Sequence, residues 1–217
     1  MTALATTDPR EISCPALESG DRMDAAEFHW RYERRPDIKK AELIDGVVYV
    51  ASPVNFSKHG NPHFNLIRAL GRYIDAQPGV AGADNASMLL GGMDEPQPDV
   101  ALCWDSDHGG TAVFDDEGNL TSAADLVAEV SYSSHSYDLH DKKDLYLRIG
   151  VREYVVWQVE EGRIDWWELR GEEYVAFTPD ERGVIESRVF PGLSLDTSAL
   201  VAGVRPTKTR KRSRRTP

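Results

Sequence analysis

The chain has 217 residues, of which 41% are hydrophobic and 28% are charged, and its formal net charge is -11. This length accommodates one well-buried domain with tails rather than two catalytic domains, and the apolar content excludes a disordered chain. No stretch approaches the roughly 18 consecutive apolar residues of a membrane span, and the start lacks the pattern of a signal peptide, so we expect a cytoplasmic protein with no membrane partner.

Charge is distributed unevenly along the chain. Residues 205–217 hold seven of the 25 Lys and Arg residues and no Asp or Glu, which leaves 18 basic residues against 36 acidic ones in the rest. We interpret 205–217 as a basic, disordered tail. It could contact the phosphates of a nucleic acid, or it could serve only as a solubilising arm.

The first 22 residues show no clear period and are predicted to form a flexible leader, so that residues 23–204 form the single domain. One of the two cysteines, Cys14, lies in this leader, and the other, Cys103, lies in an apolar run. Two separated cysteines indicate neither a disulfide framework nor a zinc site built from cysteine ligands.

The domain is predicted to begin with a helix and a hairpin. Residues 24–43 carry apolar side chains near helical spacing, interrupted at Pro36, which predicts a helix and then a short helical turn over 41–43 that contains Glu42. Residues 43–51 predict two strands joined by an Asp-Gly turn at Asp45.

The middle of the chain is predicted to contain a helix followed by two strands. Residues 62–74 form an amphipathic helix in this interpretation, with Pro62 in its first turn. The strands are predicted at 86–90 and 99–104, and a polar loop follows over about 105–122.

Residues 126–130 form a short apolar run of the kind found in buried strands, except that Glu129 interrupts it. Burying an unpaired carboxylate is costly unless a metal ion or hydrogen bonds compensate. Glu129 is therefore the candidate functional residue with the strongest physical argument.

The remaining chain is predicted to form a helix and four strands, the last three as an antiparallel meander. The helix runs from about Ser136 to Ile149, begins after the capping residues Ser133 and Ser134, and ends at Gly150. The strands are 152–159, 164–169, 174–178 and 184–189. Helices that flank a central mixed sheet place the chain in the α/β (α+β) class.

Trp166 and Trp167 are adjacent in a predicted strand, so their side chains must point to opposite faces. Packing in a core or an interface explains these rings more simply than base stacking. One of the two is therefore expected to be available for a homodimer contact.

Three residues in this order of elements suggest phosphodiester chemistry. Such hydrolysis needs a hard divalent cation bound by oxygen ligands, and a cationic side chain for the developing charge. Asp99 opens a strand, Glu129 lies in the next apolar run, and Lys142 follows on a helix.

A larger set of short segments accompanies these residues: 42–49, Ser52-Pro53, His59, Pro98-Asp99, Glu129-Val130, Tyr137-Asp138, Lys142, Tyr146, Gly150-Val151, Glu153-Tyr154 and 190–193. With this set the chain resembles, over about residues 24–200, the putative restriction endonuclease family of bacteria. That family was long a domain of unknown function within the PD-(D/E)XK nuclease superfamily. The resemblance implies a restriction-endonuclease-like fold, DNA as partner and Mg²⁺ or Mn²⁺ as cofactor.

The resemblance also implies roles for individual residues. Asp99 and Glu129 would be the core metal ligands, Glu42 the auxiliary acid and a further ligand, and Lys142 the catalytic cation. The superfamily places its Lys two residues after the Glu, where this chain has Ser131. Lys142 on the neighbouring helix would take over that role.

Accessory residues follow from helical spacing and from the same resemblance. Asp138, Lys142 and Tyr146 are four residues apart and share one helix face, whereas Lys143 lies about 100° round the helix. His59 would contact phosphate or water at the mouth of the site, or it is an ordinary loop histidine.

Each candidate also has a structural interpretation. Asp99 could be a strand-start acid, Glu42 an exposed helix-end residue, and Lys142 part of a surface ion pair with Asp138 worth about 0.3–0.5 kcal/mol. The buried position expected for Glu129, together with the resemblance, favours the functional interpretation, and we predict a Mg²⁺-dependent DNA endonuclease. The alternative is a catalytically silent member of the same fold that binds nucleic acid or protein.

Overall fold

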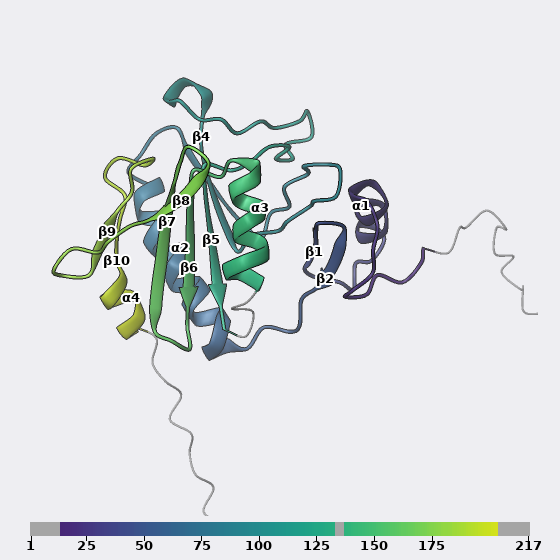
Figure 1. Ribbon diagram of the computed structural model, residues 1–217, viewed down its shortest axis with the longest axis horizontal. Helices are drawn as coiled ribbons and strands as arrows, with labels where there is room; N and C mark the ends of the chain where they lie inside the picture. Colours follow the sequence, from purple (N-terminus) through teal and green to yellow (C-terminus); the bar gives the residue numbers. More distant parts are fainter. Residues whose placement is uncertain (1–13, 133–136, 204–217) are drawn as a thin grey trace, which may run out of the picture.

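The computed structural model describes residues 14–132 and 137–203, apart from the side chain of Asp138. Its centre is a six-stranded sheet with the strand order β3-β4-β5-β6-β7-β8 (Figure 1). The strands are β3 (Val80–Asp84), β4 (Val100–Trp104), β5 (Leu126–Ser131), β6 (Glu153–Gln158), β7 (Arg163–Arg170) and β8 (Glu173–Ala176). β5 and β6 are parallel and the other neighbours are antiparallel. The predicted mixed sheet flanked by helices is confirmed.

Two helices cover opposite faces of this sheet (Figure 1). Alternation along β5 turns Leu126, Ala128 and Val130 toward the core shared with α2 (Asn61–Ile74). The intervening Val127 belongs to the core shared with α3 (Lys142–Ile149). Glu129 lies two residues after Val127 on the same strand, so its side chain also points to the α3 face.

Trp166 and Trp167 follow the same alternation. Trp166 is buried in the α2-side core, and Trp167 packs on the α3-side core, as predicted for adjacent strand residues. The Lys143 ammonium lies 4.0 Å from the centroid of the Trp167 ring and covers it. A homodimer contact through one of these rings stays a prediction.

A small N-terminal unit stands beside the sheet and consists of α1 (Ala25–Glu33), β1 (Ala41–Ile44) and β2 (Val47–Val50) (Figure 1). Asp24 caps α1 by accepting a hydrogen bond from the backbone N–H of Glu27. Residues 45 and 46 both have positive φ, +48° and +72°, which is the pattern of a type I′ hairpin turn. The predicted hairpin is confirmed.

The N-terminal unit has a small core of its own, to which the predicted leader contributes. Leu17 is buried there with Phe28, Leu43 and Val48. Residue 22 forms an isolated bridge with Val47 of β2. Part of the chain before Met23 therefore packs on the hairpin.

Two predicted elements of the first half are wrong. Residues 41 and 42 belong to the strand β1 rather than to a helical turn, because β1 pairs with β2 on one side and the backbone of Leu43 bonds Glu95 on the other. Residues 86–90 make no strand, and only Met88 forms an isolated bridge. The edge strand is β3, whose small and largely exposed residues give a weak hydrophobic signal.

The predicted C-terminal meander is wrong in its third strand. β9 (Val184–Glu186) pairs with β10 (Ser194–Asp196) in a separate two-stranded sheet, followed by the short helix α4 (Thr197–Gly203). The physical reason is burial, because Ile185 and Leu195 join the core on the α2 face instead of extending the main sheet.

Both central helices are preceded by π-helical turns, at Phe56–Gly60 before α2 and at Tyr137–Asp141 before α3. A short 3₁₀ helix at Ser106–His108 lies in the predicted polar loop. The predicted caps Ser133 and Ser134 lie outside the described residues. Within the described ranges, no helix is long and apolar enough to cross a membrane.

Candidate active site

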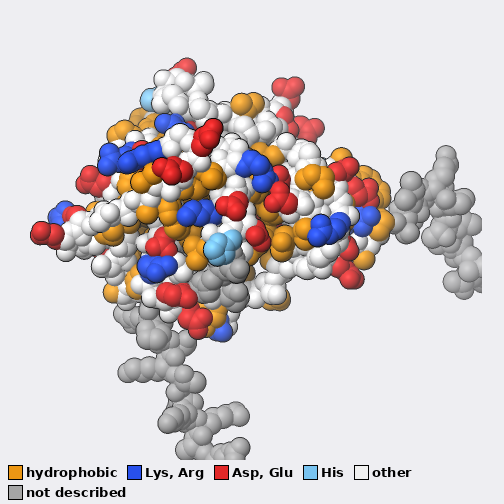
Figure 2. Space-filling model, in the orientation of Figure 1, with side chains coloured by type: hydrophobic (Ala, Val, Ile, Leu, Met, Phe, Trp, Pro, Cys, Tyr) orange, Lys and Arg blue, Asp and Glu red, His pale blue; other side chains and the backbone are white. Residues whose placement is uncertain are grey.

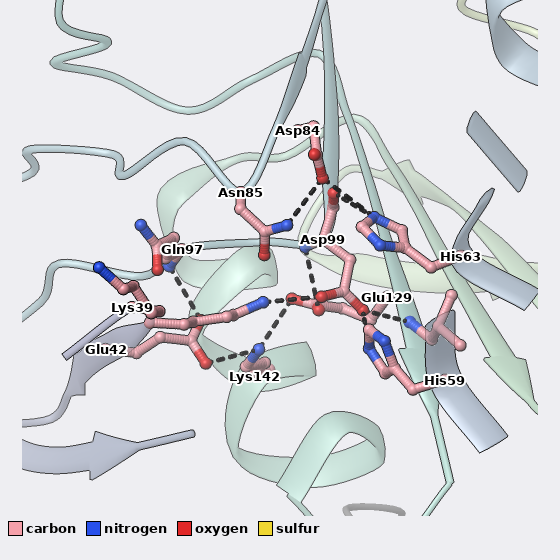
Figure 3. Close-up of polar contacts among 12 residues, drawn as sticks. Lys39, Glu42, His59, His63, Asp84, Asn85, Gln97, Asp99, Glu129 and Lys142 are labelled. Carbon is pink, nitrogen blue, oxygen red and sulfur yellow. Dashed lines mark hydrogen bonds and ion pairs between the residues drawn. The ribbon is translucent and has the colours of Figure 1, made fainter. Parts of the chain in front are cut away.

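Asp99 and Glu129 lie next to each other because of the pairing between β4 and β5 (Figure 3). Val100 pairs with Ala128 in this antiparallel ladder, and one further step places Asp99 opposite Glu129. The backbone N–H of Asp99 donates to Glu129 Oε2 (3.3 Å), and the N–H of Val130 donates to Asp99 Oδ2 (2.8 Å). Both acids are at most 3% exposed. The sheet register therefore builds a buried acid pair.

Lys142 reaches this pair from α3. Its ammonium donates to Glu129 Oε1 at 2.9 Å, and the hydroxyl of Tyr146, one turn later, donates to the same oxygen at 2.9 Å. Lys142 is 3% exposed, so it is not the surface ion pair of the alternative interpretation. The side chain of Asp138, the third residue of the predicted face, lies outside the described part.

Glu42 enters the site from β1 rather than from a helix end. Its Oε2 lies 2.8 Å from the Lys142 ammonium, and its Oε1 accepts a hydrogen bond from the backbone N–H of Gln97 (2.8 Å). The backbone groups of Leu43 and Glu95 exchange two hydrogen bonds, of 3.0 and 2.8 Å. These contacts hold the N-terminal hairpin against the segment that leads into β4.

Lys40 is a member of the site that the sequence analysis missed. Its ammonium lies 2.7 Å from Asp99 Oδ1, and its side chain is 21% exposed. The carbonyl of Lys40 accepts from the N–H of Ala51 (3.0 Å), which continues the hairpin pairing. Residues 40 and 42 therefore point to the same face. Interpreting 40–44 as a strand would have revealed this residue.

Two histidines contact Asp99 from the other side. His59 Nε2 lies 3.0 Å from Asp99 Oδ2, and His63 Nε2 lies 2.9 Å from the Asp99 carbonyl oxygen. The π-helical turn at 56–60 runs directly into α2, and both rings reach Asp99 from this continuous helical segment. π-Helical turns often occur at functional sites. His59 Nδ1 is buried and has no hydrogen-bond partner among the described residues.

The surroundings give the two central acids different protonation behaviour. Burial alone would raise the pKa of Asp99, but the His59 hydrogen bond and the Lys40 charge outweigh it and hold that pKa well below its usual range. Burial dominates at Glu129 and raises its pKa to about 7, against the opposing charge of Lys142. Acids with separated pKa values are a common arrangement in sites that perform acid-base chemistry.

The donor set of the acid pair suits a hard divalent cation. Mg²⁺ binds oxygen, usually through one or two carboxylates, and retains several waters. In the described parts of the chain, no three His, Cys, Asp or Glu side chains form a ready-made metal cage. Asp99 and Glu129 fit a hydrated ion, and Lys40 already places a positive charge on Asp99 Oδ1.

Two surface pockets lie elsewhere. One, of about 550 Å³, lies between α2 and the β10–α4 segment, and the other, of about 660 Å³, lies between α1 and the strands β3 and β4. Neither is lined by Lys40, Glu42, His59, Asp99, Glu129 or Lys142. The buried charges, and not surface shape, therefore identify the candidate site.

The sequence matches a protein family, and the fold matches a solved structure. The sequence profile of the family Uma2, described as putative restriction endonuclease, matches residues 25–198. A crystal structure of a putative nuclease belonging to DUF820, from Anabaena variabilis ATCC 29413, superposes with a TM-score of 0.63 at 17% identity. The match covers 84% of this chain and 99% of that one. No curated protein matches the sequence.

Proposed function

We propose that this chain, which belongs to the Uma2 family of putative restriction endonucleases, is a metal-dependent endonuclease that hydrolyses phosphodiester bonds of DNA. The observation that carries the proposal is the buried pair of Asp99 and Glu129 with the Lys142 ammonium 2.9 Å from Glu129. Acids and a lysine of this kind are the groups that phosphodiester hydrolysis requires.

Asp99 and Glu129 would hold Mg²⁺ or Mn²⁺, with Glu42 as a further acid beside them. When bound, such an ion would polarise the phosphodiester and acidify an attacking water. The protein itself would hold the two acids and the Lys142 ammonium in fixed positions around the phosphate. The Lys142 ammonium, clamped by Glu42 and Glu129, would stabilise the negative charge that develops on the phosphate oxygens.

Tyr146 and His59 would support these groups. The Tyr146 hydroxyl and the Lys142 ammonium fix the orientation of Glu129 by donating to its Oε1. His59 fixes Asp99 through Nε2, and its buried Nδ1 is suited to a water molecule. Both residues would therefore act by positioning the acids.

Charge on the surface bears on how DNA would be held. Acidic and basic side chains are interspersed on the face shown in Figure 2. With 36 acidic residues in the chain, phosphate binding would depend on local clusters and on the seven Lys and Arg residues of 205–217, which lie outside the described residues. We therefore expect affinity for DNA to fall steeply with salt.

The same acidic charge favours a second candidate, a catalytically silent binding protein of this fold. A nuclease gains affinity and association rate from a basic surface, and an acidic body supplies neither. In this alternative the charged cluster would be structural, and the protein would bind its partner without cleaving it. Divalent cations would then have no effect on the substrate.

Cleavage of supercoiled plasmid, linear duplex, single-stranded DNA and RNA in Mg²⁺ or Mn²⁺ separates these candidates. We expect nicking or linearisation of DNA by the wild type, and no cleavage by Asp99→Asn or Lys142→Met when circular dichroism shows that they are folded. Lys39→Met is the matched control, because the Lys39 ammonium bonds the Pro36 carbonyl instead of the acids. Equal cleavage by wild type and Asp99→Asn would reject the proposed site.

A further inference from the structure

Lys40 contributes a second ammonium group to the acid cluster, and it serves a different acid from Lys142. Lys142 lies between Glu42 and Glu129, at 2.8 and 2.9 Å. Lys40 lies 2.7 Å from Asp99 Oδ1. Three buried carboxylates are thus faced by two ammonium groups, and the lysine on Asp99 is the one nearer to solvent.

The two lysines are held with different strength. Lys142 is 3% exposed and bridges two acids, whereas the side chain of Lys40 is 21% exposed and, among the described residues, forms an ion pair with one oxygen of Asp99. A lysine has a flexible stem of four carbons, so an ammonium at a partly exposed rim can turn into water without movement of the backbone. Lys40 is therefore better placed than Lys142 to leave the cluster when another cation replaces it at Asp99.

A divalent ion on Asp99 and the Lys40 ammonium would compete for the same oxygen. Mg²⁺ binds carboxylate oxygens at about 2.0–2.1 Å, and an ammonium 2.7 Å from that oxygen would then stand close to the ion. Like charges at such separation repel each other strongly in a partly buried site. Both cations cannot occupy Asp99 Oδ1 favourably at once.

We propose that Lys40 is a displaceable counter-ion of the metal site. It neutralises Asp99 when no divalent ion is bound, and it swings away from Asp99 when the ion enters. This inference rests on the proposed function, because it assumes that Asp99 and Glu129 receive the ion. Lys40 thus preserves the arrangement of the acids at the expense of metal affinity.

Metal affinity provides the first test, measured with Mn²⁺ by electron paramagnetic resonance and isothermal titration calorimetry without any substrate. Lys40→Met removes the competing charge and keeps the length of the side chain, and it is expected to tighten Mn²⁺ binding about tenfold, within the usual range of coupling between two sites. Lys39→Met removes the same charge one residue away, at an exposed position, and is expected to change affinity less than about twofold.

The outcomes distinguish the two proposals. Equal or weaker Mn²⁺ binding by Lys40→Met than by wild type would overturn the counter-ion role and leave the proposed nuclease intact. Absence of Mn²⁺ binding in wild type and in Lys40→Met, or binding that survives Asp99→Asn, would overturn the metal site itself. Equal tightening by Lys39→Met and Lys40→Met would show that only net charge matters, which also overturns the inference.

A measurement on the wild-type protein avoids the risk that Lys40→Met fails to fold. Brief acetylation of lysines, followed by peptide mass spectrometry, reports how accessible each ammonium is. Addition of Mg²⁺ is expected to increase acetylation of Lys40 about fivefold or more, and to leave Lys39 unchanged as an internal reference. An unchanged ratio of Lys40 to Lys39 at saturating Mg²⁺ would overturn the inference.

Discussion

Lys142→Met is the most informative single substitution for the charged cluster. The ammonium lies 2.8 Å from Glu42 Oε2 and 2.9 Å from Glu129 Oε1, and all three residues are at most 6% exposed. Methionine fills a similar volume but removes the charge. The variant therefore leaves two buried carboxylates without their shared cation, while the hydrogen bond of Glu129 to Tyr146 remains.

The expected loss of stability follows from these contacts. Removal of one partner of a buried ion pair typically costs about 3–5 kcal/mol, because the other charge stays buried. Glu129 has a pKa of about 7, raised mainly by burial, so it can take up a proton when the lysine is gone. This relief places the expected cost near 3 kcal/mol, or roughly a 10 °C fall in Tm for a domain of this size.

Urea unfolding followed by Trp fluorescence measures this cost, and a double-mutant cycle assigns it to the ion pair. Lys142→Met is compared in wild type and in Glu129→Gln, where its cost is expected to be at least about 1 kcal/mol smaller. Lys143→Met is the matched control, since its ammonium rests on the Trp167 ring outside the cluster. A cost below about 1 kcal/mol, as for an exposed pair, or one independent of Glu129, would refute the reasoning.

Three further predictions concern the scaffold. Glu153→Ala removes a buried acceptor of four hydrogen bonds, from an indole, a hydroxyl and two backbone N–H groups, and should cost about 3 kcal/mol in urea unfolding, with a smaller loss for Glu153→Gln. Gly110→Ala would press its Cβ onto backbone atoms at the end of β4 and should lower the free energy of unfolding by about 2 kcal/mol. Gly71→Ala, whose Cβ would lie in open space on α2, should be neutral or stabilising. Equal effects of the two substitutions would contradict this. Burial raises the pKa of the Cys103 thiol to about 11. Iodoacetamide at pH 8 should therefore alkylate the partly exposed Cys14 first, and Cys103 should become reactive only toward pH 11. Peptide mass spectrometry at both pH values measures the alkylation of each cysteine.

Local chemistry made much of the fold predictable from the sequence. The Asp45-Gly46 turn, the amphipathic helix over 62–74 and the buried run around Glu129 each carry a signal within a few residues. Glu129 stood out because a carboxylate in an apolar strand needs compensation, and the structure supplies it from α3 and from the Asp99 backbone. The spacing of apolar residues within a single helix or strand was sufficient for these inferences.

Long-range pairing set the limits of prediction. The edge strand β3 consists of small, largely exposed residues, so apolar content pointed instead to 86–90. The apolar spacing over 24–43 predicts helix through residues 40–42, and this prediction hides the shared face of Lys40 and Glu42. β9 is not part of the main sheet because it pairs with β10, which follows it after the next turn. Each of these depends on contacts that no local window contains.

The energetics of the cluster bear on why these residues are present. The N-terminal hairpin, the strands β4 and β5 and the helix α3 bring together Lys40, Glu42, Asp99, Glu129 and Lys142. Apolar side chains in place of a buried ionic group are often neutral or stabilising, by about 1–4 kcal/mol, because the desolvation of charge is avoided. The stability of the sheet alone therefore does not account for the cluster. Under the proposed function the charges would serve ligands instead, namely a divalent ion that takes the place of Lys40 at Asp99 and a phosphodiester beside the Lys142 ammonium.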